Sequence, residues 1–335
     1  MIKRWNKVFI HDKVMPEWIY RSINLIMCIL DIFYWMLLSC ARVKTNSEGG
    51  GKYYFSICAI FKDESLSIKE WIEYHKLIGV EHFYLYNNKS KDSSVSILQK
   101  YVEEGIVTLI DWNVMPPAQA AAYNDFKKKF WTETQWVAFI DLDEYICLKY
   151  DTKIKDWFSK YEHYPSLVVY WKMFGSSGLI EHDKSRLITE QYFIAWDRYS
   201  DIGKPIFNTR FEAVETTLKY IHLLPAKVSI CGYDFTVPPI NEFRKFIKYK
   251  SNRVGIFKSI SDFTIQINHY ATKSYLEYFC TRRKRGDVNA FANNTSIKAY
   301  KYTQEFAIKP DYTIYRFLPF LKVRMDDTIS NYFDD

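Results

Sequence analysis

The sequence predicts an α/β fold in which a mostly parallel sheet carries helices on both faces. After residue 51, apolar runs of strand length alternate with segments whose apolar residues recur at helical spacing. The connections between them are short, as in a parallel sheet with helical crossovers. Polar residues follow several of the runs, as expected at the sheet edge where such folds bind ligands.

Seven segments between residues 53 and 140 carry this alternation. Strand-length apolar runs occupy residues 53–61, 82–86, 106–112 and 136–140. Helical periodicity occupies residues 65–78, 95–102 and 118–131. His75 falls on the apolar face of the first helix, so we expect a packed, hydrogen-bonded residue there rather than a ligand. After residue 150 the pattern is less regular, with strand-like runs at residues 167–170, 187–196 and 263–270.

These patterns divide the 335 residues into an N-terminal helix and linker (1–51), a main domain (52–290) and a C-terminal extension (291–335). Lys and Arg outnumber Asp and Glu by 46 to 39, a net charge of +7 that favours anionic ligands. The basic residues are spread out and no nucleic-acid-binding motif occurs, so no nucleic-acid partner is expected. The six cysteines form no Cys-x-x-Cys pair, which argues against a zinc site.

Residues 22–40 are almost continuously apolar, about the length that a bilayer-spanning helix needs. Several polar residues nevertheless fall within an arc of roughly 80° on a helical projection. They are Arg21, Asn24, Asp31, Ser39 and Arg42. This pattern favours a helix lying on a membrane, with the rest of the chain on the cytoplasmic face. A single-pass membrane anchor and a helix packed on the protein are the open alternatives.

Asp141 and Asp143 directly follow the apolar run 136–140. Two carboxylates one residue apart at a strand end can reach one hard cation and leave coordination positions for phosphate oxygens. Such a cation, Mn²⁺ or Mg²⁺, would neutralise the charge that develops when a sugar–diphosphate bond breaks. A solvated acidic turn is the alternative. His269, at the close of the run 263–270, could be a third metal ligand.

Polar side chains also follow the first two strands. Residues 62–64 (Lys-Asp-Glu) come after the first, and residues 87–92 (Asn-Asn-Lys-Ser-Lys-Asp) come after the second. They could contact a base and ribose, although ordinary turns and helix starts favour the same residue types. Further along the chain, Lys273 and the basic run 282–285 could hold phosphates.

At these residues the sequence resembles glycosyltransferase family 92 and the related bacterial family-2-like enzymes. The resemblance extends from about Phe55 to Val288. It is carried by several blocks in order: Lys62-Asp63-Glu64, residues 70–75 (Glu-Trp-Ile-Glu-Tyr-His), residues 79–83, residues 87–92, residues 141–145 (Asp-Leu-Asp-Glu-Tyr), residues 171–178, Asn268-His269-Tyr270, Lys273-Ser274 and Arg285-Gly286.

The resemblance implies a GT-A fold, that of nucleotide-diphospho-sugar transferases, with an inverting mechanism and a divalent cation. It implies that Asp141, Asp143 and His269 bind the metal. The residues that it assigns to the nucleotide-sugar donor are Asp63, Glu64, Asn88, Ser90, Asp92, Lys273 and Arg285. Asp63 departs from the family pattern, which usually has Asn at this position.

The expected function is transfer of a sugar from a nucleotide-diphospho-sugar to a glycan or lipid-linked glycan, in polysaccharide or lipopolysaccharide-type biosynthesis. Inversion needs a general base near the acceptor hydroxyl. Asp183 is the first candidate and Glu190 the second, with Glu181 behind them. A metal-dependent phosphoester hydrolase is the alternative, but a two-metal site would need more ligands at strand ends than occur here. A non-catalytic glycan-binding module is a third hypothesis.

Overall fold

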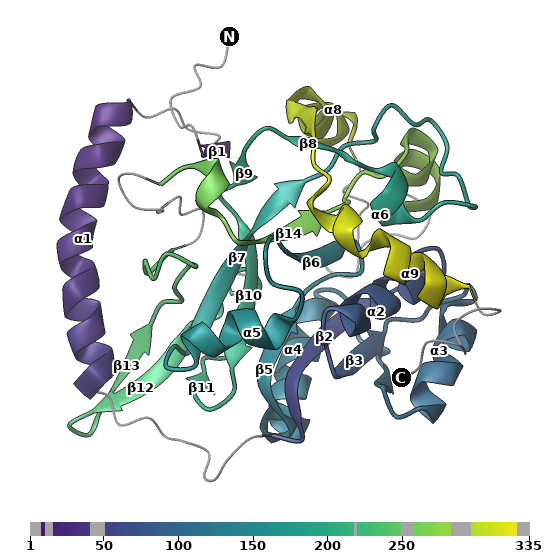
Figure 1. Cartoon of the computed structure of the whole chain (residues 1–335). Helices are drawn as coiled ribbons and strands as arrows, with labels where there is room; N and C mark the ends of the chain where they lie inside the picture. The colour runs from purple at the N-terminus through teal and green to yellow at the C-terminus, as the bar shows by residue number, and fades with distance from the viewer. Residues whose placement is uncertain are drawn as a thin grey trace.

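The computed structural model describes residues 8–10, 16–40, 51–217, 220–248, 253, 258–282 and 296–326. An eight-stranded sheet with the strand order β4-β3-β2-β5-β10-β7-β14-β6 forms its centre (Figure 1). Its strands are β2 (Tyr53–Phe61), β3 (His82–Asn87), β4 (Val107–Asp111), β5 (Thr134–Phe139), β6 (Glu144–Leu148), β7 (Ser166–Met173), β10 (Gly203–Asn208) and β14 (Ile265–His269).

Helices and three small sheets surround this sheet. The α-helices are α1 (Glu17–Cys40), α2 (Ile68–Leu77), α3 (Ser94–Glu103), α4 (Ala118–Lys129), α5 (Ile154–Phe158), α6 (Ile188–Gln191), α8 (Ile297–Phe306) and α9 (Leu318–Met325). Shorter turns are η1 (Trp131–Glu133), η2 (Ser159–Tyr161), η3 (Ile260–Asp262), η5 (Thr313–Phe317) and the π-helix η4 (Glu277–Arg282). The small sheets pair β1 (Phe9–Ile10) with β9 (Tyr199–Ser200), β8 (Ile194–Trp196) with β15 (Ala307–Pro310), and β11 (Glu212–Ala213) with β12 (Ala226–Ile230) and β13 (Tyr233–Val237).

The central sheet is mostly parallel, as predicted. The pairs β4–β3, β3–β2, β2–β5 and β7–β14 are parallel, while β10 and β6 run against their neighbours. The carboxyl ends of β2, β3, β5, β7 and β14 therefore meet at one edge of the sheet.

Helices cover both faces. On α2, Trp71 packs against Phe83 at 5.5 Å between ring centroids, and on α4, Phe126 packs against Tyr84 at 4.9 Å. Phe83 and Tyr84 are consecutive in β3 and so point to opposite faces. The predicted α/β class is confirmed, and all seven expected elements before residue 141 are present within a few residues of their predicted bounds.

The strand expected at residues 187–196 is correct only at its end. The segment begins as the short helix α6 and becomes strand β8 only at Ile194. The buried carboxylate of Glu70, on α2, accepts hydrogen bonds from the backbone N–H groups of Ile188 (2.7 Å) and Thr189 (2.9 Å). These N–H groups open the helix and need an acceptor, so a residue more than a hundred positions away supports the helical start.

His75 is a packed residue, as predicted. Its Nε2 accepts a hydrogen bond from the backbone N–H of Ile146 (3.2 Å), so its Nδ1 carries the proton and donates to the carbonyl of Trp71 (2.8 Å). Burial lowers the pKa of His75 to about 3, so the ring stays neutral. It joins α2 to β6, the strand that begins at Glu144.

Helix α1 runs along one side of the molecule, near the β12–β13 ribbon (Figure 1). Asp31, one of the polar residues of its predicted stripe, is buried against the rest of the chain. Its carboxylate accepts two hydrogen bonds from Arg253 (3.1 and 2.9 Å) and lies 3.1 Å from the ammonium of Lys245. Tyr34 donates to the carbonyl of Pro238 (2.8 Å). None of the helices that the structure describes combines the length and hydropathy that crossing a bilayer requires.

Part of the predicted C-terminal extension packs on the main domain. Strand β15 pairs with β8, and η5 places Phe317 against Tyr74 of α2 at 5.8 Å between ring centroids. Arg324 of α9 lies 3.5 Å from the carboxylate of Glu73. The division at residues 52 and 290 stays a prediction.

Candidate active site

Three side chains that could bind a metal converge at the carboxyl edge of the sheet. Strand β6 begins at Glu144, and antiparallel pairing places Glu144 opposite His269, the last residue of β14. Asp143 immediately precedes β6, and its carbonyl accepts a hydrogen bond from the backbone N–H of Tyr270 (2.8 Å). One ligand atom from each of Asp143, Glu144 and His269 lies within 4.8 Å of the others.

The donor set fits a divalent cation. His269 Nε2 lies 3.6 Å from Asp143 Oδ1 and 3.9 Å from Glu144 Oε1. Glu144 Oε1 is buried and has no hydrogen-bond partner among the described residues. A buried carboxylate oxygen without a donor is costly, and a cation in contact with it would remove that cost. Two carboxylates and an imidazole are ligands that Mn²⁺ accepts.

The three groups differ in their affinity for protons. Burial acts to raise the pKa of Asp143, but the nearby His269, Arg282 and Lys273 outweigh it and hold that pKa well below its usual range. Burial raises the pKa of Glu144 to about 8, against the attraction of Lys204. For His269, burial acts to lower the pKa, but Asp143 outweighs it and the pKa is raised. Without an ion, Glu144 and His269 therefore tend to hold protons, and a divalent cation that binds here would have to displace them.

Asp141 occupies a different position from Asp143. Its Oδ2 accepts a hydrogen bond from Lys204 Nζ (2.8 Å) and its Oδ1 one from Gln119 Nε2 (2.6 Å). To coordinate an ion directly, one of these oxygens would have to exchange its present donor for the ion. Lys204 also lies 3.7 Å from Glu144 Oε2, which in turn accepts a hydrogen bond from the backbone N–H of Asp141 (2.9 Å). Lys204 thus joins both ends of the acidic motif.

Sequence reasoning did not identify Lys204 or Gln119 as part of this site, nor Glu144 as a ligand candidate. The sequence does hold one signal for Lys204. This residue is the single lysine in the strand Gly-Lys-Pro-Ile-Phe-Asn, which is buried. A lysine that is 1% exposed needs a counter-charge, so its position implied a buried carboxylate nearby. The sequence did not identify that carboxylate, because the choice depends on β10 entering the sheet between β5 and β7.

The polar residues after β2 and β3 hold those two strand ends together. The backbone N–H of Asp63 donates to Ser90 Oγ (3.0 Å), and Asp63 Oδ1 accepts from the backbone N–H of Lys91 (2.6 Å). Asp92 accepts from the backbone N–H groups of Ser65 (2.8 Å) and Ser94 (2.9 Å). These hydrogen bonds bring Asp63, Ser90 and Asp92 together and fix the shape of the loops, and the role of these residues in donor binding stays a prediction.

Glu64, Lys273 and Asn88 complete the predicted donor residues that the structure describes. Lys273 Nζ lies 3.9 Å from Glu64 Oε2, so the loop after β14 reaches the loop after β2. Asn88 donates to the carbonyls of Trp112 (2.9 Å) and Val114 (3.1 Å) and thus supports the segment after β4. Arg285 lies outside the described residues.

A basic residue of η4 approaches the metal ligands. Arg282 Nη1 lies 3.6 Å from Asp143 Oδ2 and donates to the carbonyl of Ala271 (2.6 Å). Asp143, Lys273, Arg282 and residues of η4 line a cleft of about 10 Å³, which has room for about one water molecule.

The two candidate bases differ in their surroundings. Asp183 is exposed and accepts hydrogen bonds from the backbone N–H (2.9 Å) and hydroxyl (2.6 Å) of Ser185. Glu190 is half-buried, with Lys322 Nζ at 2.7 Å and Arg186 Nε at 3.7 Å from its Oε1. Glu190 thus binds two cations, whereas Asp183 faces solvent.

Replacing Lys204 with Met tests its role in holding the acidic motif. The variant leaves the buried Glu144 and the partly buried Asp141 without their cation, so we expect the free energy of unfolding to fall by about 3 kcal/mol. Lys227→Met is the control, because the ion pair between Lys227 and Glu212 is about half-exposed and should contribute less than about 1 kcal/mol. Urea denaturation of both variants measures the difference. Equal, small losses would show that Lys204 does not stabilise the motif.

Two solved structures resemble parts of this chain weakly. Staphylococcus aureus TarS (residues 1–349) in complex with UDP is 18% identical over 47% of each chain, with a TM-score of 0.31. Glucosyl-3-phosphoglycerate synthase from Mycobacterium tuberculosis, in complex with Mn²⁺, UDP and glucosyl-3-phosphoglycerate, is 11% identical over 49% of this chain and 61% of that chain, with a TM-score of 0.29. At TM-scores this low, neither likeness carries an argument about this chain.

Curated relatives and a family model agree with each other. A glycosyltransferase family 92 protein of Ricinus communis is 29% identical over 180 residues, which are 51% of this chain and 31% of the relative. One of Oryza sativa subsp. japonica is 27% identical over 155 residues, 44% of this chain and 26% of the relative. The matched region thus spans under a third of these relatives. The model of glycosyltransferase family 92 matches residues 51–283, and the chain therefore belongs to this family.

Proposed function

We propose that this chain is an inverting, metal-dependent glycosyltransferase that moves a sugar from a nucleotide-diphospho-sugar to a glycan or lipid-linked glycan. The observation that carries the proposal is the convergence of Asp143, Glu144 and His269 at the carboxyl edge of a mostly parallel sheet. Ligands of such folds bind at this edge. Membership of glycosyltransferase family 92 supports the reaction class.

In this proposal Asp143 and His269 hold a Mn²⁺ or Mg²⁺ ion together with Glu144. Asp141 belongs to the same site, and its carboxylate orients Lys204 beside Glu144. The ion supplies positive charge against the diphosphate of the leaving group. Lys273 and Arg282 lie on the same side of the cluster and are further cations for that diphosphate.

The loops after β2 and β3 form the proposed nucleoside site. Asp63, Ser90 and Asp92 are fixed by hydrogen bonds between the two loops, which limits the entropy lost when a ligand binds. Glu64 faces Lys273 from this side, and Asn88 lies at the end of β3. Arg285 remains a proposed diphosphate contact by family resemblance alone.

Asp183 is the proposed general base and Glu190 the second candidate. The loop that carries Asp183 is hydrogen-bonded to the segment after Lys273, since the carbonyls of Leu179 and Ile180 accept from the N–H groups of Tyr275 (3.3 Å) and Leu276 (2.9 Å). An exposed carboxylate on a loop beside the donor site is accessible to an acceptor hydroxyl. Glu190 is less available as a base because Lys322 and Arg186 bind it.

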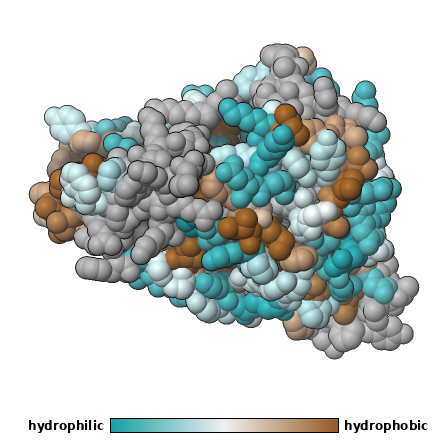
Figure 2. All heavy atoms as spheres, turned by 90° about the horizontal axis from the view of Figure 1, so that it is seen from above, coloured by the Kyte–Doolittle hydropathy of each residue, from teal (hydrophilic) through white to brown (hydrophobic). Residues whose placement is uncertain are grey.

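We further propose that α1 holds the protein on the cytoplasmic face of a membrane, where lipid-linked acceptors occur. The helix docks on the protein through Asp31 and Tyr34 and turns its apolar residues outward. Figure 2 shows apolar atoms at the margin where α1 lies. The large apolar side chains of α1 that are at least 44% exposed are Trp18, Ile23, Leu25, Ile26, Ile29, Leu30, Ile32, Phe33 and Met36. A continuous apolar face of this kind fits a lipid surface.

Asp143→Asn tests the metal site. The variant keeps the volume of the side chain but removes a charged ligand, so the enhancement of nucleoside-diphosphate binding by Mn²⁺ should fall at least tenfold. Calorimetric titration of a panel of nucleoside diphosphates with and without Mn²⁺ measures this. Asp111→Asn is the control, because Asp111 ends β4, the edge strand at the other end of the sheet from β6, and is no member of the cluster. Unchanged Mn²⁺-dependent binding by Asp143→Asn would contradict the assignment.

Asp183→Asn tests the base. Transfer to acceptor should fall about 100-fold or more, because the amide cannot accept the proton of the acceptor hydroxyl. Binding of the donor should change less than twofold, since the base acts on the acceptor. Transfer kinetics and donor titration on the same preparation separate the two effects. If Glu190→Gln abolishes transfer and Asp183→Asn does not, Glu190 is the base.

Paired substitution of Ile26 and Phe33 by Gln tests the membrane proposal. The apolar side chains would no longer enter the lipid, so binding to phosphatidylserine-containing vesicles should weaken at least tenfold in a sedimentation assay. The control replaces Ile308 and Phe320, which are 51% and 62% exposed on other elements, by Gln. Equal weakening by both pairs, or by neither, would show that α1 is not the membrane contact.

A further inference from the structure

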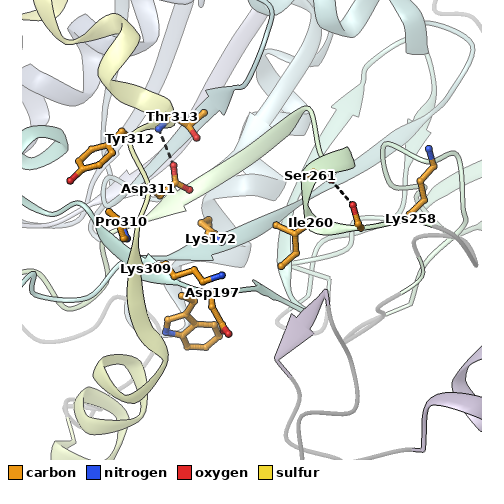
Figure 3. A pocket seen from close by; sticks show the side chains of 12 residues that line it. Lys172, Asp197, Lys258, Ile260, Ser261, Lys309, Pro310, Asp311, Tyr312 and Thr313 are labelled. Carbon is orange, nitrogen blue, oxygen red and sulfur yellow. Dashed lines mark hydrogen bonds between the residues drawn. The ribbon is translucent and has the colours of Figure 1, made fainter.

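A second cavity, of about 650 Å³, lies away from the candidate active site (Figure 3). It lies where β7, the end of β8, η3 and the segment after β15 meet, and Lys172 of β7 lines it. The preceding residue, Trp171, packs against His269 of the active site at 4.5 Å between ring centroids. Consecutive strand residues point to opposite faces, so this cavity and the metal ligands lie on opposite sides of the sheet. Its volume is within the range of small-molecule sites.

Lys172 places a buried ammonium group in the lining of this cavity. Its side chain is buried, with 7% of the residue exposed, and no ion pair or hydrogen bond joins its ammonium to another of the residues that the structure describes. The ammonium lies 5.0 Å from the centre of the Tyr199 ring. Burial lowers the pKa of Lys172 to about 8, against the attraction of Asp311 and Asp197. A buried ammonium that lines a cavity and lacks a direct counter-ion favours an anion in that cavity.

Neither carboxylate of the described lining forms an ion pair with Lys172, although both attract its ammonium at longer range. Asp311 Oδ2 accepts a hydrogen bond from Gln266 Nε2 (3.0 Å), and its Oδ1 accepts one from the backbone N–H of Thr313 (2.9 Å). Asp197 Oδ1 accepts from Arg198 Nε (3.1 Å). Both carboxylates thus have other donors. Among the described residues, the lining holds three lysines against these two aspartates.

The rest of the lining combines polar and apolar groups. In Figure 3 the side chain of Lys309 extends toward the space beside Lys172, and Ile260 lies on the other side of it. Ser259 and Ser261 add hydroxyl groups, which hydrogen-bond each other (2.5 Å) and would have to share that bond with a ligand. Hydroxyl groups and an apolar wall suit a saccharide, and the ammonium groups suit an acid group on it.

We propose that this cavity is a second binding site, for a saccharide unit that carries a carboxylate or phosphate. Lys172 and Lys309 bind the acid group, and the serines of residues 259–261 bind sugar hydroxyls. That the ligand is part of a glycan rests on the proposed function. The site then holds a charged unit of the acceptor glycan remote from the sugar that receives the transfer, and it contributes to affinity for acidic acceptors without taking part in the reaction.

Titration of three oligosaccharide or sugar probes tests the proposal. The wild-type protein should bind tetragalacturonate and glucose 6-phosphate more tightly than neutral maltotetraose. Lys172→Met should weaken binding of both charged probes at least tenfold and leave maltotetraose unaffected. The variant should stay folded, because Met replaces a buried, unpaired ammonium with an apolar chain of similar length, and thermal unfolding checks this. Lys309→Met should weaken the same probes severalfold. Lys100→Met, at a lysine 67% exposed on α3, is the control and should change nothing.

Equal binding of the charged probes by wild type and Lys172→Met, or equal binding of charged and neutral tetrasaccharides, would overturn the proposal. Inorganic phosphate that binds at Lys172 as tightly as glucose 6-phosphate would show that the cavity recognises the anion alone and not a sugar. Nucleoside-diphosphate binding with Mn²⁺ is measured on the same variants and should be unchanged. If the wild type binds no nucleoside diphosphate with Mn²⁺, the proposed glycosyltransferase function is contradicted. If it binds the nucleoside diphosphate but not the charged probes, only the second site is contradicted.

Discussion

The structure of the candidate active site depends on one buried ammonium group. Lys204 is 1% exposed and lies 2.8 Å from Asp141 and 3.7 Å from Glu144. Without a cation, the three carboxylates of Asp141, Asp143 and Glu144 would repel one another in a region of low dielectric constant. Lys204 balances Asp141 and one oxygen of Glu144, while Arg282 lies 3.6 Å from Asp143. The other oxygen of Glu144, with its neighbours Asp143 and His269, is left for an ion.

The sheet explains how these charges come to lie together. Lys204 is on β10, which runs against its neighbours between β5 and β7, so it reaches the carboxyl edge from the opposite direction. The pairing of β6 with β14 brings Glu144 opposite His269. Behind this edge, α2 fixes the start of β6, since Trp71 donates to the carbonyl of Glu144 (2.8 Å) and His75 accepts from the N–H of Ile146. Glu144 and His269 therefore rest on strands, and Asp143 lies in the turn directly before β6.

Buried charge organises other parts of the molecule in the same way. Asp31 attaches α1 to Arg253 and Lys245, so this polar residue faces the protein while many large apolar side chains of the helix stay exposed. Glu70 accepts from the first N–H groups of α6. In both cases an acid group on one element is satisfied by donors from a distant segment. Lys172 differs from these groups because its ammonium lies over the ring of Tyr199 and forms no ion pair or hydrogen bond with another described residue.

The sequence by itself determined the α/β class, the elements from β2 to β5 and the acidic residues after β5, because hydrophobic periodicity is a local property of the chain. It also identified His75 as a packed residue. Tertiary structure decided that Glu144 joins Asp143 and His269, that Asp141 binds Lys204, that residues 188–191 are helical and that Asp31 faces inward. Each of these outcomes depends on a partner far away in the chain. Strand order and side-chain charge pairing, which no local pattern encodes, select that partner.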